Sequence, residues 1–352
     1  MSRPKLMIYG ATGYTGQLVV AEAVTGGLRP VLAGRSPKKL AALTRWSTLD
    51  KRTVAVGDAD GLTSALEDIT VLVNCAGPFS RTAQPVVEAC CKTGTHYLDI
   101  TGELAVFEAL AACDAAARQA KIMVLPGAGC DVLPSDCLIA DLAARNPGGR
   151  CLRLGLAAHS GFSQGTLRTV LDGLDNFRIR RDGAIVRVEA GSLRHDFDFG
   201  EGPNTALVSV LGDVATAYRS TGIANIETYS QTSRPVELLM WTARRFGGLL
   251  TMRWPRRLLD AVIRQGPAGP GERERRTSHA TFVAEIEDAD GERVTSRLRV
   301  ADPYGFTAAA VVAIAARVLQ GDVRLGYQTP SLAYGADFVC QFDGVAWDRP
   351  DG

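Results

Sequence analysis

The fold is decided near the start of the chain, where Lys5-Leu-Met-Ile-Tyr9 runs directly into Gly10-Ala-Thr-Gly13-Tyr-Thr-Gly16. The apolar stretch predicts a strand, and the helical spacing of 17–24 predicts a helix after it. Three glycines, each three residues apart, are typical of a dinucleotide-binding turn when they lie between a strand and a helix. The first permits the tight turn, the second lets a pyrophosphate approach the backbone, and the third lets the helix pack on the strand.

Strand-like and helix-like stretches then alternate as far as residue 125. The predicted strands are 5–9, 30–33, 53–56, 71–74, 96–99 and 122–125, and the predicted helices include 62–67, 85–92 and 106–119. Short strands rich in β-branched residues and separated by helices form parallel sheets that are covered on both faces. The expected fold class is α/β, with a doubly wound Rossmann sheet over 1–130.

The pattern changes after Pro134, where a helix is predicted over 135–145. Beyond it, 178–189 and 281–300 are typical of hairpins that turn at Asp182-Gly183 and Asp290-Gly291. We therefore expect a second, α+β domain over 131–300, with a mixed or antiparallel sheet, for substrate binding or dimerisation.

Composition and charge limit the classes of function. The 352 residues are 46% hydrophobic and carry 39 basic against 38 acidic side chains, which argues against nucleic-acid binding through net charge. The longest apolar run, 308–316, is about half of the roughly 20 residues that a membrane span needs. Eight cysteines without a C-x-x-C pair indicate neither zinc nor a disulfide framework, and a strand within five residues of the start leaves no room for a signal peptide. We expect a cytoplasmic protein without a metal site, because His159, His195 and His279 have no second metal-type residue at ligand spacing.

The end of the second strand predicts which nucleotide is bound. An Asp or Glu there bonds the ribose 2′-hydroxyl of NAD, whereas an Arg can hold the 2′-phosphate of NADP. This chain has Gly34-Arg35-Ser36, with Lys38 and Lys39 in the next turn and no acid nearby. A guanidinium can meet a phosphate bidentately, so NADP(H) is favoured. The alternative is that Arg35 is an ordinary surface residue.

Two further strand ends have residues suited to the rest of the nucleotide. Asp58 follows the third strand and is either placed to bond an adenine edge or a simple turn residue. After the fourth strand, Asn74-Cys75-Ala76-Gly77-Pro78-Phe79 offers small residues for the nicotinamide ribose and a ring to pack on the nicotinamide. Cys75 is interpreted as a small buried residue rather than a nucleophile.

Five motifs together resemble the saccharopine dehydrogenase-like oxidoreductases, a family that includes trans-acting enoyl reductases. The motifs are Gly10–Gly16, Leu32–Arg35, Asn74–Phe79, Gly94–Glu103 and Gly127–Asp136, with a weaker likeness at 302–307 and 326–330. The resemblance implies an N-terminal NADP-binding Rossmann domain, a mixed-sheet domain, and a C-terminal segment, 301–352, that returns to the Rossmann domain.

The residues expected to contact NADP(H) come from these motifs. The resemblance implies contacts from Gly10, Thr12, Gly13, Tyr14, Thr15, Gly16, Arg35, Asp58, Ala76, Gly77 and Phe79, and the same turns add Gly34, Ser36, Cys75 and Pro78. It leaves the substrate open, because members act on C–N bonds of amino-acid adducts or on C=C bonds of carrier-bound acyl chains.

Catalytic candidates lie in the loops after the fifth and sixth strands, where ligands of such sheets bind. Tyr97 is the expected proton donor, with Asp99 and Asp131 orienting substrate or water. Strand alternation places Tyr97 and Asp99 on one face and His96, interpreted as structural, on the other. The alternative is that Asp99 and Thr101 cap the following helix while Tyr97 packs in the core.

A basic apolar stretch and the distribution of lysines bear on the substrate. Residues 235–264 combine tryptophans with arginines, six of them against one aspartate over 244–264. They could form a wall for an acyl chain on an acidic carrier protein, or contact a membrane surface, and a covered helix with a solvated arginine face is the alternative. The last of six lysines is Lys121, which disfavours the lysine acid–base chemistry of saccharopine-forming enzymes.

These observations predict an NADPH-dependent oxidoreductase that reduces a C=C bond of an apolar or carrier-bound enoyl substrate. One alternative is a saccharopine-type or imine-reducing C–N oxidoreductase. Another is a non-catalytic NADP sensor that binds partners through 235–264. No nucleic-acid partner is expected, and a homodimer is an open alternative.

Overall fold

The computed structural model describes residues 4–159, 163–164, 177–231, 266 and 268–350. It divides into two compact units, Met1–Leu133 with Tyr304–Tyr334 and Pro134–Pro303 with Gly335–Gly352. The first unit is therefore built from two separate lengths of chain, and the stretch 301–352 is divided between the two units. Among the described residues, none of the helices has the length and apolar character needed to cross a bilayer.

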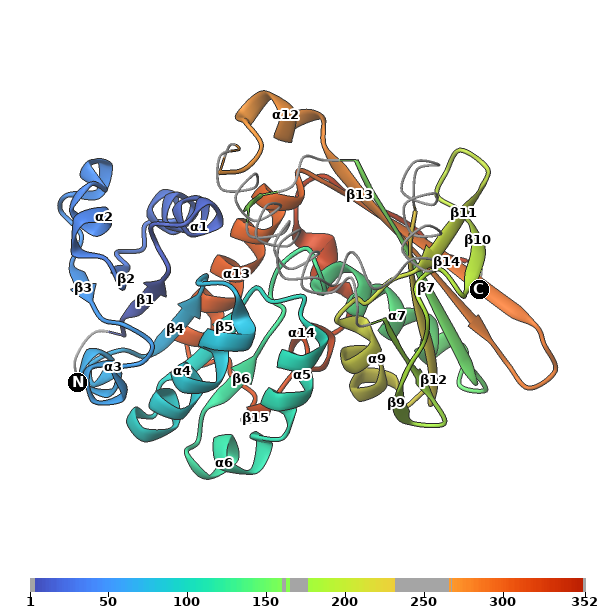
Figure 1. Ribbon diagram of the computed structural model, residues 1–352, viewed down its shortest axis with the longest axis horizontal. Coiled ribbons are helices and arrows are strands. Elements are labelled where there is room, and N and C mark those ends of the chain that lie inside the picture. Colours follow the sequence, from blue (N-terminus) through green and yellow to red (C-terminus); the bar gives the residue numbers. More distant parts are fainter. Residues whose placement is uncertain (1–3, 160–162, 165–176, 232–265, 267, 351–352) are drawn as a thin grey trace. The chain divides into compact units, whose positions relative to one another are not determined.

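The first unit contains a seven-stranded parallel sheet (Figure 1). Its strands are β1 (Leu6–Tyr9), β2 (Val31–Gly34), β3 (Lys51–Thr53), β4 (Val71–Asn74), β5 (His96–Asp99), β6 (Met123–Leu125) and β15 (Gly326–Tyr327), in the order β15-β6-β5-β4-β1-β2-β3. The order reverses between β1 and β4, and ligands of such sheets bind beyond the carboxyl ends of the strands at this switch point. The predicted doubly wound sheet is confirmed, and β15 adds a strand that the sequence did not predict.

Helices surround this sheet. They are α1 (Tyr14–Thr25), α2 (Pro37–Ala41), α3 (Ala59–Leu66), α4 (Phe79–Thr93), α5 (Leu104–Ala111), α6 (Asp114–Gln119), α13 (Pro303–Leu319) and α14 (Pro330–Tyr334), with a short 3-10 helix η1 (Thr44–Trp46). Helix α4 packs against both α3 and α5. The rings of Tyr14 and Tyr304, 5.2 Å apart between centroids, join α1 to α13. The late segment is thereby held to the first helix of the chain.

The helix predicted over 106–119 is broken into α5 and α6. Helix α6 begins at Asp114, whose carboxylate accepts a hydrogen bond from the Tyr327 amide at 2.7 Å. This bond holds β15 beside β6, where Gly326 and Tyr327 pair with Met123 and Val124. The break in the helix therefore allows a contact with a segment that lies 213 residues away in the sequence. Local periodicity does not indicate such a contact.

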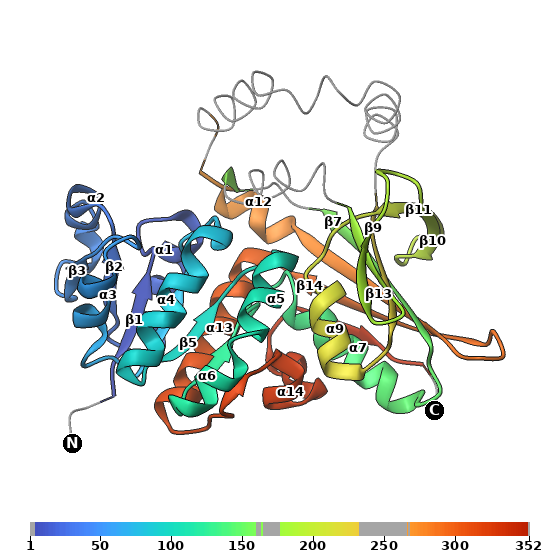
Figure 2. The same ribbon diagram turned by 60° about the horizontal axis from the view of Figure 1, so that its bottom comes forward.

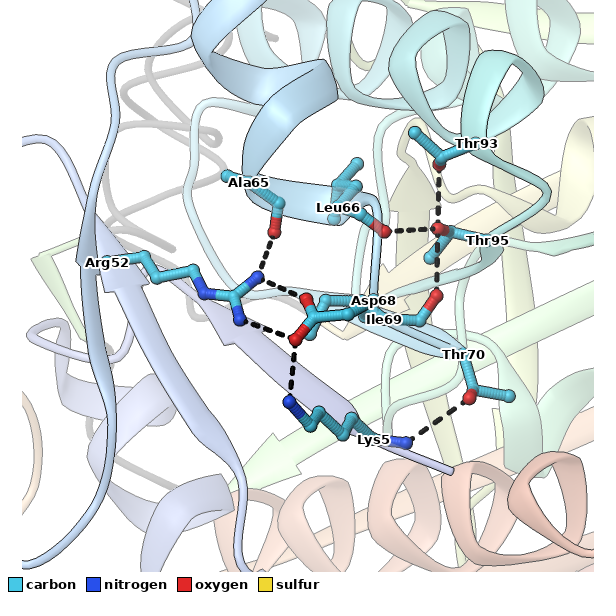
Figure 3. A network of polar contacts seen from close by, with 9 residues as sticks. All are labelled: Lys5, Arg52, Ala65, Leu66, Asp68, Ile69, Thr70, Thr93 and Thr95. Carbon is cyan, nitrogen blue, oxygen red and sulfur yellow. Dashed lines mark hydrogen bonds and ion pairs between the residues drawn. The ribbon is translucent and has the colours of Figure 1, made fainter. Parts of the chain in front are cut away.

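A polar network closes the amino edge of the first sheet, the edge at which its strands begin (Figure 3). Asp68 accepts two hydrogen bonds from the Arg52 guanidinium, at 2.7 and 2.9 Å, and one from Lys5 Nζ at 2.6 Å. Hydrogen bonds from Arg52 and Lys5 lower the pKa of Asp68 well below its usual value. The Thr95 hydroxyl, which is buried, donates to the Ile69 carbonyl at 3.0 Å. The groups at this edge satisfy one another.

The second unit contains a nine-stranded, mostly antiparallel sheet (Figure 2). Its strands are β7 (Cys151–His159), β8 (Arg178–Arg181), β9 (Ala184–Arg187), β10 (Arg194–Asp198), β11 (Pro203–Val208), β12 (Asn225–Gln231), β13 (His279–Glu287), β14 (Arg293–Ala301) and β16 (Val345–Asp348). The helices among its described residues are α7 (Leu133–Arg145), α9 (Asp213–Thr221) and α12 (Glu272–Thr277), with a 3-10 helix η2 (Ala336–Gln341). Both predicted hairpins are confirmed, as β8–β9 and β13–β14.

Pairing within this sheet runs in the order β10-β11-β12-β7-β13-β14-β16, and β8 pairs with β12 and β9. Only β12 and β7 run parallel among the described pairs. Strand β16, from the end of the chain, pairs with β14. The last described residues thus complete the second sheet, whereas β15 from the same C-terminal stretch joins the Rossmann sheet.

Candidate cofactor site

The turn between β1 and α1 requires two of its three glycines for the fold itself. Gly10 has φ +84°, and a Cβ there would lie 2.8 Å from the Ala76 amide nitrogen. A Cβ on Gly16 would overlap the Gly10 carbonyl oxygen. Gly13 differs, because it is exposed and a Cβ there would meet only the Gly10 oxygen, at 3.3 Å. The space beside Gly13 is therefore open to an external group.

The amino end of α1 is suited to an anion. Gly13 is its N-cap residue, no side chain caps the helix, and its first turn holds no acidic residue. The first amides of a helix have no partner within the helix, and its dipole favours negative charge at this end. Backbone groups of this turn are thus available to a pyrophosphate, and its binding here stays a prediction.

At the end of β2, Arg35 is exposed and makes no hydrogen bond or ion pair with any residue that the structure describes. Its charge lowers the pKa of Tyr9, although burial, the larger effect, raises it. Gly34 is buried in the strand, and the Ser36 hydroxyl accepts from the Lys39 amide and caps α2. Arg35 is thus a free guanidinium beside a buried strand end, as a 2′-phosphate would require.

Asp58 caps α3, because its carboxylate accepts a hydrogen bond from the Gly61 amide at 2.9 Å. A Cβ on Gly61 would overlap this carboxylate, so the cap fits a glycine. The side chain is exposed and holds the turn that follows β3. Its contact with an adenine edge stays a prediction.

The loop between β4 and α4 is fixed by partly buried hydrogen bonds. The Ala76 amide donates to Asn74 Oδ1 at 3.0 Å, and the Thr82 hydroxyl donates to the Ala76 carbonyl at 2.6 Å. Burial and the Asp99 carboxyl raise the pKa of the Cys75 thiol to about 12, so it stays protonated and is a poor nucleophile. Gly77 at the bend is exposed, and Phe79 is half-buried against the core.

A buried chain of side chains links this loop to the next two. Asn74 Nδ2 donates to the Tyr97 hydroxyl at 3.2 Å, and that hydroxyl donates to Asp99 Oδ2 at 2.8 Å. All three side chains are fully buried. The other carboxylate oxygen, Asp99 Oδ1, accepts from the amides of Thr101 and Gly127 at 2.9 and 3.0 Å. The chain therefore fixes the loops after β4, β5 and β6 relative to one another.

The burial of Tyr97 and Asp99 bears on their predicted roles. They share a face of β5, as alternation predicted, and their side chains meet. Burial raises the pKa of Asp99 to about 6 and the pKa of Tyr97 well above its usual value. The Tyr97 hydroxyl has no exposed surface and belongs to the core, contrary to what a proton donor needs. Tyr97 packs in the core, as the alternative has it, but the expected cap is not observed. The N-cap of α5 is Glu103, no side chain caps this helix, and Asp99 instead accepts from the Thr101 amide within the loop.

Sequence reasoning assigned no role to Glu103, which the structure places at the amino end of α4. Its carboxylate accepts from the Phe79 amide at 2.8 Å and from the Ser80 amide at 3.0 Å. A carboxylate on the first amides of a helix is stabilised by the helix dipole. The sequence shows Glu103 at the end of a polar loop after a strand. It does not show that this loop meets the amino end of α4.

The loop after β6 presents Asp131, which is exposed. Gly102 adjoins it, since a Cβ on Gly102 would lie 3.2 Å from Asp131 Cβ. The Cys130 amide donates to the Thr307 hydroxyl of α13 at 3.0 Å, so the late segment holds this loop. Of the three catalytic candidates, Asp131 alone has a solvent-facing side chain. The stretch 235–264, predicted to bind a carrier or a membrane, lies outside the described residues.

Comparison with known proteins agrees with this geometry. Residues 6–125 match the family model of the saccharopine dehydrogenase NADP binding domain. The chain is 32% identical over 148 residues to a "Probable mitochondrial saccharopine dehydrogenase-like oxidoreductase" of Arabidopsis thaliana, covering 37% of this chain and 33% of that one. It is 37% identical over 108 residues to a "Trans-acting enoyl reductase" of Mycobacterium ulcerans, covering 28% and 26%.

A solved structure extends the likeness to the whole fold. Apo saccharopine dehydrogenase (L-Glu forming) from Saccharomyces cerevisiae superposes with a TM-score of 0.65 and 14% identity, over 96% of each chain. At that identity the likeness concerns the fold alone. The matched stretches span about a quarter to a third of the two named relatives' lengths. Residues 6–125 of this chain are thus similar to the saccharopine dehydrogenase NADP binding domain, and the fold of the chain is similar to that of saccharopine dehydrogenase.

Proposed function

We propose that the chain is an NADPH-dependent oxidoreductase that reduces a C=C bond of an apolar or carrier-bound substrate. The observation that carries the cofactor assignment is the combination of an open helix end at Gly13 with an unpartnered guanidinium at Arg35. These two features supply the backbone amides for a pyrophosphate and the charge for a 2′-phosphate. When bound, the nucleotide supplies the hydride.

The chain's own residues would position the reacting groups. In this proposal Gly77 and Phe79 border the nicotinamide end of the site, on a loop fixed by Asn74. Tyr97 and Asp99 act as positioning residues, because their hydrogen bonds hold three loops while their side chains stay buried. Asp131, which is exposed, orients the substrate or a water molecule.

The preference for a C=C bond rests on the placement of lysines and on the names of relatives. Lys92 lies in the last turn of α4, and Lys121 lies directly before β6, so both are remote from the carboxyl ends of the strands. Lys38 and Lys39 lie in α2, after β2 and beside Arg35, so a saccharopine-type mechanism with lysine acid–base groups lacks a lysine in the loops after β4, β5 and β6. The enoyl reductase name of a relative supports the same choice.

The test is a spectrophotometric assay of NADPH oxidation with enoyl thioesters, imines and keto acids as separate substrates. Turnover of enoyl thioesters, free or on a carrier protein, is the expected result. Turnover of imines or amino-acid adducts alone would overturn the C=C assignment while leaving the oxidoreductase in place. Tight NADPH binding without turnover of any class would favour the alternative of a sensor.

A further inference from the structure

Two histidines that are far apart in the sequence meet in the second unit. His159 ends β7 and His279 begins β13, and the antiparallel register pairs these two residues directly. Directly paired residues project their side chains from the same face of a sheet. Their rings stack, with centroids 4.5 Å apart and planes 13° apart. Spacing along the sequence does not indicate this pair, because strand register brings the two residues together.

We propose that His159 and His279 form a binding site for a divalent transition-metal ion of the kind that imidazole prefers, such as Cu²⁺, Ni²⁺ or Zn²⁺. Neutral imidazole is the commonest metal ligand in proteins. Paired residues on neighbouring strands have Cβ atoms about 4.5–5.5 Å apart, so both rings can reach one ion. In this proposal, binding turns the stacked rings about the broad χ2 torsion until one nitrogen of each faces the ion.

Two charged side chains act electrostatically on the His279 ring. Glu201 favours a cation there, and Arg299 opposes it.

The other two of the four histidines are engaged elsewhere. His96 Nδ1 accepts from the Met123 amide at 3.0 Å, and His195 Nε2 lies 2.6 Å from Glu285 Oε2. Within the described ranges, no group of three or more histidines, cysteines and acids is arranged to hold a metal. The pair therefore supplies two ligands, and water fills the remaining coordination positions. The site is independent of the nucleotide and of the proposed reaction.

The test is calorimetric titration of Cu²⁺ and Ni²⁺ into the untagged full chain after removal of metals by a chelator. We expect saturable binding of one ion per chain. His159→Phe keeps an aromatic ring in the stack but removes the ligand, and His279→Ala removes the other ligand. Loss of an outer-shell partner costs about 10–100-fold in metal affinity, so each variant should lose at least tenfold.

Controls separate this result from misfolding and from binding elsewhere. His195→Gln, outside the pair, should bind as the wild type does, and the melting curve of metal-free His159→Phe should match that of the wild type. The melting temperature of the wild type should rise with added metal, because the ion binds only the folded chain. Absence of saturable binding, or equal affinity in the wild type and His159→Phe, would overturn the proposal.

Discussion

The two edges of the Rossmann sheet contrast in how their polar groups are satisfied. At the amino edge, Asp68 accepts hydrogen bonds from both Arg52 and Lys5, and the Thr95 hydroxyl donates to a main-chain carbonyl (Figure 3). At the carboxyl edge, Arg35 has no partner in the described part of the chain, and no side chain caps α1. One edge is closed by its own side chains, whereas the other presents groups that a bound anion would satisfy.

The carboxyl edge itself also contains both kinds of group, satisfied and unsatisfied. Beneath the exposed groups, Asn74, Tyr97 and Asp99 form a buried layer in which each oxygen has a partner. The exposed groups that would bind the ligand therefore lie on loops that are fixed by buried, fully hydrogen-bonded side chains. Variants at the two edges and in the two layers should separate nucleotide binding from stability.

The largest effects are expected at the glycine turn. Gly16→Ala forces a Cβ into the Gly10 carbonyl and should lower the melting temperature sharply or prevent folding. Gly13→Val places a Cβ 3.3 Å from the Gly10 carbonyl oxygen, a close contact but not an overlap, so the chain should fold but lose detectable binding of both NADPH and NADH. Melting curves and equilibrium dialysis measure the two effects. Binding of either nucleotide by folded Gly13→Val would contradict the pyrophosphate site.

The buried layer should give a pH-dependent stability. The pKa of Asp99 is about 6 in the folded chain, above the unfolded value of about 3.9. The folded chain thus holds this proton more tightly, and Asp99 should reduce the free energy of unfolding by up to about 3 kcal/mol as pH rises from 4 to 6. Asp99→Asn should flatten this part of the profile of melting temperature against pH. An unchanged slope in the variant would show that another group titrates.

Arg35→Asp should separate the two nucleotides. Hydrogen bonds to charged groups contribute about 1.5–3 kcal/mol, so NADPH affinity should fall about 10- to 100-fold. NADH lacks the 2′-phosphate and should bind as before, while Arg45→Asp supplies a control for the change of charge alone. Fluorescence titration with both nucleotides measures the difference. An equal loss for NADPH and NADH would remove the phosphate role of Arg35.

The smallest effect is expected at the amino edge. Asp68 is partly exposed, so Asp68→Asn should cost only about 1 kcal/mol of stability and should leave NADPH affinity unchanged. Because the pKa of Asp68 is lowered in the folded chain, its contribution is present at neutral pH and is lost as pH falls below about 4. The melting temperatures of variant and wild type should therefore converge in acid. A loss of nucleotide affinity would instead show that the two edges are coupled.

The parts of the site that the sequence predicted are those encoded locally. A glycine that must adopt φ +84°, as Gly10 does, or a guanidinium placed directly after a strand, as Arg35 is, leaves its mark within a few residues. Alternation along β5 likewise placed Tyr97 and Asp99 together. Their burial was not predictable in the same way, because it depends on the helices that cover the strand.

The remaining contacts depend on tertiary structure. Glu103 caps a helix that begins 24 residues earlier, and Thr307 bonds an amide 177 residues before it. The pairing of His159 with His279 follows from strand register across the second sheet. No periodicity in the sequence reports such partners. The family resemblance includes Glu103 and, more weakly, 302–307, but a matching motif does not say which groups meet.

The discontinuity of the first unit has a consequence for biosynthesis. Its sheet lacks β15, and the β6 loop lacks its Thr307 contact, until residues 304–334 have left the ribosome. The whole second unit except its final segment is translated before that moment. The first unit therefore stays incomplete while the second unit is synthesised. A truncation after residue 133 would leave the sheet without β15 and would not produce a complete domain.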